Sequence, residues 1–228
     1  MRPFARLFHS TPQTGQPNAQ GTLATYWSLP SEQLLSALHA GNMFSMAGAS
    51  MLLPFLPLLA PQILLNNFLS DIPATTIASD NVDPEWVEKP RRWNTTFIRN
   101  YMVLFGLVSS IFDFLTFGTL WFLFHASQEE FQTGWFIESL LTELVIALVV
   151  RTRHLFFRSR PGTLLLVSTL IFIGITLVIP YLPFMSVFGF VPLPAPLMLA
   201  MIGLTAMYVL VTELAKKYFY SRVGNAVA

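Results

Sequence analysis

The sequence of 228 residues is 54% apolar and only 11% charged, with a mean hydropathy of +0.57. A soluble chain usually has about a quarter of its residues charged, so this composition excludes an ordinary soluble domain and indicates an integral membrane protein. The chain contains no cysteine, which excludes disulfides, thiolate catalysis and cysteine-based zinc sites. Its net charge of +1 indicates little about function, and the positions of the charged residues along the chain are more informative.

The N-terminal segment, residues 1–33, is polar and rich in Gln, Pro, Thr, Ser and Gly, with the core STPQTGQPNAQG. Such a segment cannot bury enough apolar surface to fold, so we predict that it is disordered. Its opening, MRPFARLF, has two arginines and is weakly amphipathic. A targeting peptide is the alternative, although the segment lacks the continuous apolar stretch of a secretory signal.

The next apolar region, residues 34–78, is too long for one span and contains four prolines. Proline interrupts helix geometry, so we predict a hairpin of two helices, 34–56 and 59–78, with a tight turn around Pro57–Pro61. A single kinked span is the alternative.

Four further apolar segments are long enough to cross a bilayer: 101–124, 133–150, 163–184 and 194–214. Backbone polar groups in lipid must be satisfied within the segment, so each is predicted to be a helix. The predicted fold is therefore an all-α membrane protein, a bundle of about six transmembrane helices of which the second is interrupted.

Lysine and arginine are distributed on one side of this predicted topology. After residue 31 they follow the second, fourth and sixth spans, whereas the alternate loops HASQEEFQT and YLPFMSVFGFVPL have none. The positive-inside rule then places both termini and the two basic loops in the cytoplasm. We expect a multi-pass protein of the cell (inner) membrane.

Besides Asp71, which is considered below, four acids lie within or at the ends of the predicted spans. An acid at the centre of a span costs about 2.5–3.5 kcal/mol on insertion scales, so its default interpretation is an ion or proton pathway. Glu213 lies beside Lys216 and is interpreted as structural. For Asp113, a structural role and a role in an ion or proton pathway both remain alternatives. Glu138 and Glu143 are about 140° apart around a helix and cannot both face one site.

The segment PQILLNNFLSDIPATT concentrates polar groups on the second predicted helix. Asn67 and Asp71 are four residues apart and share a face, Ser70 adjoins the acid, and Pro73 frees backbone carbonyls. A carboxylate, an amide, a hydroxyl and free carbonyls are ligands for a hard cation, and interrupted helices carry such sites in transporters. The alternative is a structural Asn/Asp pair.

Several long stretches resemble P-type cation-transporting ATPases. NNFLSDIPATTIASDNVDPEWVEKPRRWN is similar to their sixth transmembrane helix and the loop that follows, and GNMFSMAGASMLLPFLPLLAPQILL resembles the fifth helix. GLVSSIFDFLTFG, FQTGWFIESLLTELVIALVVRTR and FYSRVG resemble the seventh helix, the eighth helix and the C-terminal end of the magnesium-importing subclass. The resemblance covers roughly residues 40–225, so residues 34–225 are interpreted as the fifth to tenth helices of such a pump.

The resemblance also implies site residues. The matching coordinating positions, which include the tentative metal ligands Asn67 and Asp71, are Asn42, Asn67, Ser70 and Asp71. Glu143 or Glu138 lies near an eighth-helix position that contributes an acid in some pumps, and Asp113 is a further, weaker ion-pathway candidate. His39 stands where the family often has an asparagine, which puts that ligand in doubt.

The sequence departs from the family in what it lacks. It has no DKTG phosphorylation motif, no TGE motif, no nucleotide-binding motif and no match to the first four helices. We therefore expect a truncated membrane domain that hydrolyses no ATP alone and binds no cofactor, with ATP used only by the parent pump and magnesium as the transported ion. The alternatives are a membrane module that modulates an intact pump and a small passive channel or carrier. Expected partners are the lipid bilayer and the missing half of the pump or an intact pump, and no nucleic acid.

Overall fold

The computed structural model describes residues 42–79, 95–152 and 160–223. The segment predicted to be disordered, His39, and the basic residues 89–92 lie outside the described residues. The described elements are helices, as predicted for an all-α membrane protein. After a helical segment at residues 42–52 they are α2 (Ala60–Thr75), η1 (Thr76–Ser79), α4 (Thr95–Gly118), η2 (Thr119–Leu123), α5 (Gln128–Val150), α6 (Thr163–Val178), η3 (Ile179–Tyr181), η4 (Pro183–Phe188) and α7 (Ala195–Val223).

Four of the described helices are long and apolar enough to cross a membrane: Arg99–Leu123, Gln128–Val150, Thr163–Tyr181 and Ala195–Ser221. They correspond to the last four predicted spans. The predicted hairpin before them appears as the segment 42–52 and the 16-residue α2, separated by the non-helical stretch 53–59. The break is centred on Pro54 and Pro57, slightly before the predicted turn. Gln132 of α5 donates a hydrogen bond to the Leu56 carbonyl there, at 2.7 Å, and holds the break against the bundle.

Local chemistry explains where several helices begin and end. α5 begins five residues before the predicted span because Ser127 and Glu130 form a reciprocal capping box, with bonds of 3.3 and 2.9 Å. α6 ends earlier than predicted and passes into a 3-10 turn that contains Pro180. α2 continues through Pro73 and ends two residues later, where the Thr76 hydroxyl donates to the Pro73 carbonyl at 2.6 Å.

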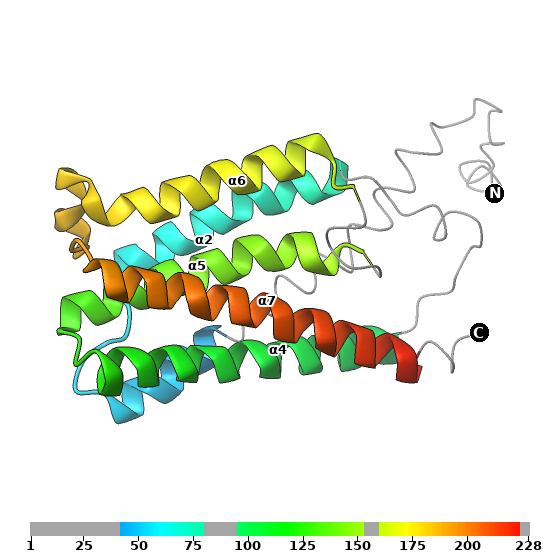
Figure 1. Ribbon diagram of the computed structural model, residues 1–228, viewed down its shortest axis with the longest axis horizontal. Coiled ribbons are helices and arrows are strands. Elements are labelled where there is room, and N and C mark those ends of the chain that lie inside the picture. The colour runs from blue at the N-terminus through cyan, green and yellow to red at the C-terminus, as the bar shows by residue number, and fades with distance from the viewer. Residues whose placement is uncertain (1–41, 80–94, 153–159, 224–228) are drawn as a thin grey trace, which may run out of the picture.

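The long helices run along one common direction and alternate in sense, so that successive helices are antiparallel (Figure 1). α5 occupies the centre: 83% of its membrane window is buried, against 28–39% for the other three spans. α2 and α6 pack on one side of α5, and α4 and α7 pack on the other. Gly134 permits the close approach, since a Cβ at this position would lie 2.8 Å from Leu120. Polar groups on α5 from Gln132 to Glu143 are therefore buried.

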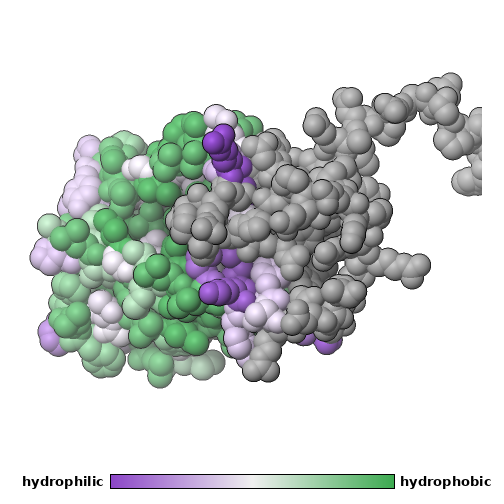
Figure 2. All heavy atoms as spheres, turned by 45° about the vertical axis from the view of Figure 1, so that its right-hand side comes forward, coloured by the Kyte–Doolittle hydropathy of each residue, from purple (hydrophilic) through white to green (hydrophobic). Residues whose placement is uncertain are grey.

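The outer surface of the bundle is an apolar belt. The space-filling view shows hydrophobic side chains over most of the coloured surface, with strongly hydrophilic ones towards one end and a few more at the opposite edge (Figure 2). Arg99 near the start of α4, Arg151 after α5, Arg160 before α6 and Lys217 near the end of α7 all fall at the same end because the helices alternate in sense. The distribution matches a bundle that spans a bilayer, with its basic residues on one side.

Candidate functional site

A carboxylate at the centre of the bundle joins the two arms of the hairpin. Glu143 of α5 is 4% exposed. Its Oε1 accepts a hydrogen bond from Asn42 Nδ2, and its Oε2 accepts one from Asn66 Nδ2 at 3.1 Å. Both oxygens of this carboxyl group are therefore satisfied in a region with little water, where an unpaired polar atom would be costly.

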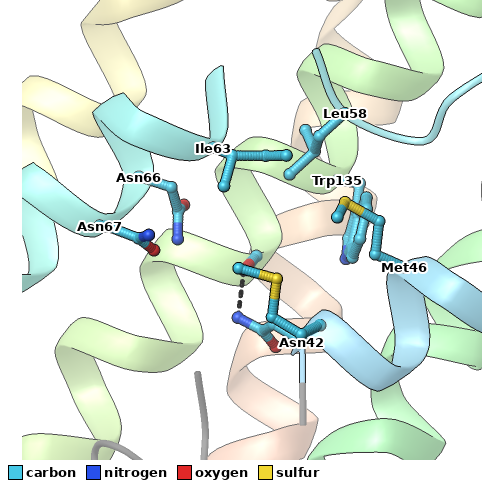
Figure 3. Close-up of a pocket in the computed structure, with 9 residues that line it drawn as sticks. Asn42, Met46, Leu58, Ile63, Asn66, Asn67 and Trp135 are labelled. Carbon is cyan, nitrogen blue, oxygen red and sulfur yellow. Dashed lines mark hydrogen bonds between the residues drawn. The ribbon is translucent and has the colours of Figure 1, made fainter. Parts of the chain in front are cut away.

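A cavity of about 30 Å³ lies between the hairpin arms and α5. Asn66 and Asn67 project towards it from α2, and Asn42 and Met46 project from the segment 42–52 (Figure 3). Asn42 Nδ2 also donates to Ser139 Oγ at 2.8 Å, the contact drawn as a dashed line. A volume of this size holds one or two water molecules and is also sufficient for one ion.

The structure places the four predicted coordinating residues differently. Asn42 and Asn67 line the cavity. Ser70 is buried, and its hydroxyl donates to the Asn67 carbonyl at 3.1 Å. Asp71 is exposed, so the expectation that it faces the interior opposite Asn42 is wrong for the described bundle. The reason is helix phase: the buried positions of α2 include Asn66 and Ser70, and Asp71 is rotated about 100° from its neighbour.

Asn66 is the ligand candidate that the sequence interpretation missed. The Asn67/Asp71 pair was chosen because it has a four-residue spacing and an acid. Gln62, Asn66 and Ser70 repeat that spacing twice, and all three are buried. This longer polar stripe is the signal in the sequence that predicts the inward face of α2.

The opposite face of α5 carries a second polar group. Trp135 Nε1 donates to Asp113 Oδ1 of α4 at 3.1 Å, and Asp113 and Glu138 are 3% and 1% exposed. Glu138 lies on this side with Asp113, while Glu143 faces the hairpin. The prediction that Glu138 and Glu143 cannot face one site agrees with these neighbours, and Trp135, which also lines the cavity, contacts Asp113.

Glu213 has the structural role that the sequence indicated. Its carboxylate forms a buried ion pair with Lys216 at 2.9 Å. The same ammonium donates to the Val149 carbonyl at 2.8 Å, near the C-terminal end of α5. A cation at a helix C-terminus is favourable, so this pair joins α7 to α5.

The chemistry of the Glu143 site suits a hard cation with a small number of oxygen ligands. Within the described ranges, no three His, Cys, Asp or Glu side chains converge as they do in a conventional metal centre. One carboxylate and the side-chain oxygens of Asn42, Asn66 and Asn67 are available instead. Asn42 and Asn66 direct their N–H groups at Glu143, so both amides must turn before their oxygens can face an ion.

Comparison with known proteins identifies the class. The family model "Cation transporting ATPase, C-terminus" matches residues 55–218. This range contains α2 with its asparagines, the whole of α4, α5 and α6, and all but the last residues of α7. The chain therefore belongs to this family, and it is a cation-pump membrane domain.

Individual curated proteins show which members of the family the chain resembles. The chain is 38% identical over 197 residues to "Magnesium-transporting ATPase, P-type 1" of Salmonella typhimurium strain LT2, which covers 84% of this chain and 22% of that protein. It is 36% identical over the same length to the protein of that name from Escherichia coli K12. The chain thus spans about a fifth of the length of the curated relatives it matches.

Proposed function

We propose that this chain forms the ion pathway in the membrane domain of an ATP-driven cation pump, and that magnesium is the transported cation. The observation that carries the proposal is the family match across residues 55–218, which contains the buried Glu143 and its donor Asn66. The printed names of the relatives supply magnesium as the first candidate. The remaining parts of such a pump would be the partners of this chain.

In this proposal, the structure corresponds to the cation-free form of the site, in which Glu143 accepts hydrogen bonds from two amides. Its two amide donors keep the hairpin arms drawn towards α5. An arriving cation would replace these N–H groups as the neutralising partner, and the amides would turn their oxygens towards it. Because the amides come from different arms of the hairpin, binding would change how the segment 42–52 and α2 sit against α5.

Asp71 has a separate role in the proposal. It is exposed on the same helix as the half-buried Asn67, and an acid facing lipid at membrane depth costs about 2.5–3.5 kcal/mol. A further helix of the pump packing on this face would bury the acid and supply the other cation ligands. Asp71, Asn67 and Ser70 are thus proposed to serve a site shared with that helix.

A chimera tests the pathway. Residues 55–218 would replace the matching region of the Salmonella typhimurium relative, and growth of a magnesium-uptake mutant on low magnesium would be measured. We expect growth with the chimera and none with its Asp71→Asn form at equal membrane abundance. The matched control, Glu129→Gln, changes an exposed acid in the first turn of α5 and should leave growth intact. Growth with Asp71→Asn would contradict the assignment of Asp71.

The chain alone should not hydrolyse ATP. The sequence contains no aspartyl-phosphate motif through which ATP energy could enter. We expect purified protein to form no acid-stable phosphoenzyme from labelled ATP. A label on an aspartate of this chain would refute the proposal.

The proposed topology places both termini in the cytoplasm, with the protein in the inner membrane. The cysteine-free sequence allows single-cysteine labelling without background. A cysteine at Ser127, between α4 and α5, should react only from the outside, and one at Arg160 only from the cytoplasm. The reverse pattern would show that the orientation is inverted.

A further inference from the structure

The connection between α6 and α7 differs in composition from the α4–α5 connection at the same end of the bundle. No charged residue and no histidine occurs between Arg160 and Glu213, so the whole α6–α7 connection, residues 179–194, is uncharged. The α4–α5 connection contains His125 and is followed at once by Glu129. Charged side chains normally cover protein surface that faces water, so the composition of the α6–α7 connection indicates a different medium.

Both sides of the α6–α7 connection are apolar. On the side that packs against the bundle, Phe190 and Leu193 are buried, and the Phe190 ring contacts Phe136 of α5 edge to face at 4.7 Å between ring centres. On the other side, the short helix η4 presents Phe184 and Val187, which are 57% and 86% exposed. A helix that is apolar all round is typical of a membrane environment.

The polar groups of the connection form hydrogen bonds within the protein. The Ser186 hydroxyl donates to the Pro183 carbonyl at 3.0 Å, and the Gly189 N–H donates to the Ser186 carbonyl at 3.0 Å. The Val191 N–H donates to Thr133 Oγ1 of α5 at 3.2 Å. Four residues of the connection are prolines, which have no N–H to satisfy. Such internal pairing is what an apolar medium requires, because an unpaired backbone group there costs several kcal/mol.

The exposed side of η4 continues the apolar belt of the bundle. η3 and η4 lie where α6 ends and α7 begins, at the end opposite the basic residues (Figure 1). Val178 at the end of α6 and Leu199 near the start of α7 are also exposed. Lipid that contacts these two helices can therefore extend onto η4 without crossing a charged side chain.

We propose that η4, Pro183–Phe188, lies in the membrane interface at the end opposite the basic residues, with Phe184 and Val187 among the lipid acyl chains. In the proposed topology this is the outer leaflet. An interfacial helix buries its apolar face about 5–10 Å into the boundary between headgroups and acyl chains. The same segment touches the hairpin break, since a Cβ at Gly189 would lie 2.6 Å from Leu59, so it joins the start of α2 to the lipid. The inference does not depend on which cation the pump transports.

Spin labelling of the full chain in lipid nanodiscs tests the assignment. The chain has no cysteine, so a nitroxide can be attached at one introduced cysteine at a time. Oxygen concentrates among acyl chains and a nickel chelate stays in water, so the ratio of their collision rates with the label reports the surrounding medium. Val187→Cys would be compared with Leu199→Cys on the apolar belt and with Glu129→Cys, which is exposed at the same end of the bundle.

We expect the oxygen-to-nickel ratio at Val187 to be close to that at Leu199 and severalfold higher than that at Glu129. Phe184→Cys should give the same result as Val187→Cys. A ratio at Val187 as low as that at Glu129 would place η4 in water and overturn the proposal.

Two other results would also contradict lipid contact. One is low access of both reagents to Val187 with spectral broadening by a neighbouring label, which would mean that a second copy of the chain covers η4. The other is a failure of Val187→Cys and Phe184→Cys to fold while Leu199→Cys folds, which would mean that these side chains are packed against protein.

Discussion

The buried acids on the two faces of α5 differ in the hydrogen-bond donors that surround them. On the hairpin face, Glu143 is bound through both oxygens by asparagine amides and borders a cavity. On the α4 and α7 face, Glu138 and Asp113 share a close-packed region with aromatic rings, where Phe117 contacts Trp135 edge to face at 4.7 Å between ring centres. Each face contains acids and hydroxyls, but only the first gives its carboxylate a full set of donors from two flexible side chains.

The difference indicates what each face can do. Amides can rotate and exchange their donors for acceptors, so the Glu143 face has the freedom that the proposed cation binding requires. The Glu138 face is fixed by Trp135 and by tight packing around Gly134, so its side chains have less room to rearrange.

Removing the Glu143 carboxylate should have the largest effect on stability. Glu143→Ala leaves the Asn42 and Asn66 amides without their acceptor, and each buried unsatisfied donor costs about 1–3 kcal/mol, so we expect a loss of roughly 3 kcal/mol. Thermal unfolding in nanodiscs would measure it. Glu143→Gln, which keeps one acceptor, should lose about half as much. Equal stability of all three proteins would show that the bridge does not hold the hairpin.

Trp135→Phe probes the other face. It keeps an aromatic ring and removes the N–H that Asp113 accepts at 3.1 Å, so we expect a loss of about 2 kcal/mol, within the range for leaving a buried acceptor unsatisfied. The same change in an Asp113→Asn background should cost less, because an amide oxygen is a weaker acceptor than a carboxyl group. A double-mutant cycle of unfolding measurements gives this coupling, and a value near zero would show that the Trp135–Asp113 hydrogen bond does not stabilise the bundle.

Gly134→Ala tests the packing between α5 and its neighbours. The added Cβ would meet Leu120 at 2.8 Å and Leu197 at 3.4 Å, so we expect a loss of about 1 kcal/mol. The cost stays at the low end because the nearest atom is the end of a leucine side chain. Gly174→Ala is the matched control: nothing lies within 4 Å of its new Cβ, and it should be neutral or slightly stabilising. If both variants have the same free energy of unfolding, close packing at Gly134 does not stabilise the position of α5 in the bundle.

Asp71→Asn should have the smallest effect on this chain. The side chain is exposed, and surface substitutions usually change stability by less than about 0.5 kcal/mol. Unfolding of the isolated chain would therefore be unchanged, whereas the chimera described above should lose transport. A large loss of stability in the isolated chain would mean that Asp71 contacts the bundle interior.

Much of the fold was predictable because it depends on composition and local chemistry. Apolar length predicted the last four spans, and the charge pattern placed the basic residues at one end of the bundle. Boundaries were less accurate where they depend on contacts or caps: α7 continues to Val223 because Lys216 and Glu213 neutralise each other at its inner face. The Ser127–Glu130 capping box is visible in the sequence and would have predicted the start of α5 at Gln128.

The candidate site was only partly predictable. Asn42 and Asn67 were found from residue type and from the resemblance, and both line the cavity. Asn66 was missed and Asp71 was given the wrong orientation, because two adjacent positions of a helix differ by about 100° and a short motif does not fix that phase. The polar stripe from Gln62 to Ser70 would have favoured the correct face.

The sequence by itself determined that this protein is a helical membrane bundle, since backbone hydrogen bonds in lipid must close within each apolar segment. It also determined the family, through long matching stretches that include Glu143 and Asn66. Only the tertiary structure decided which acid belongs to which site. Glu138 and Glu143 are the same residue type on one helix, and they differ because α4 brings Asp113 to one face while the hairpin brings two amides to the other. The state of a buried carboxyl depends on the donors and charges that neighbouring helices place around it, and their placement is a property of packing.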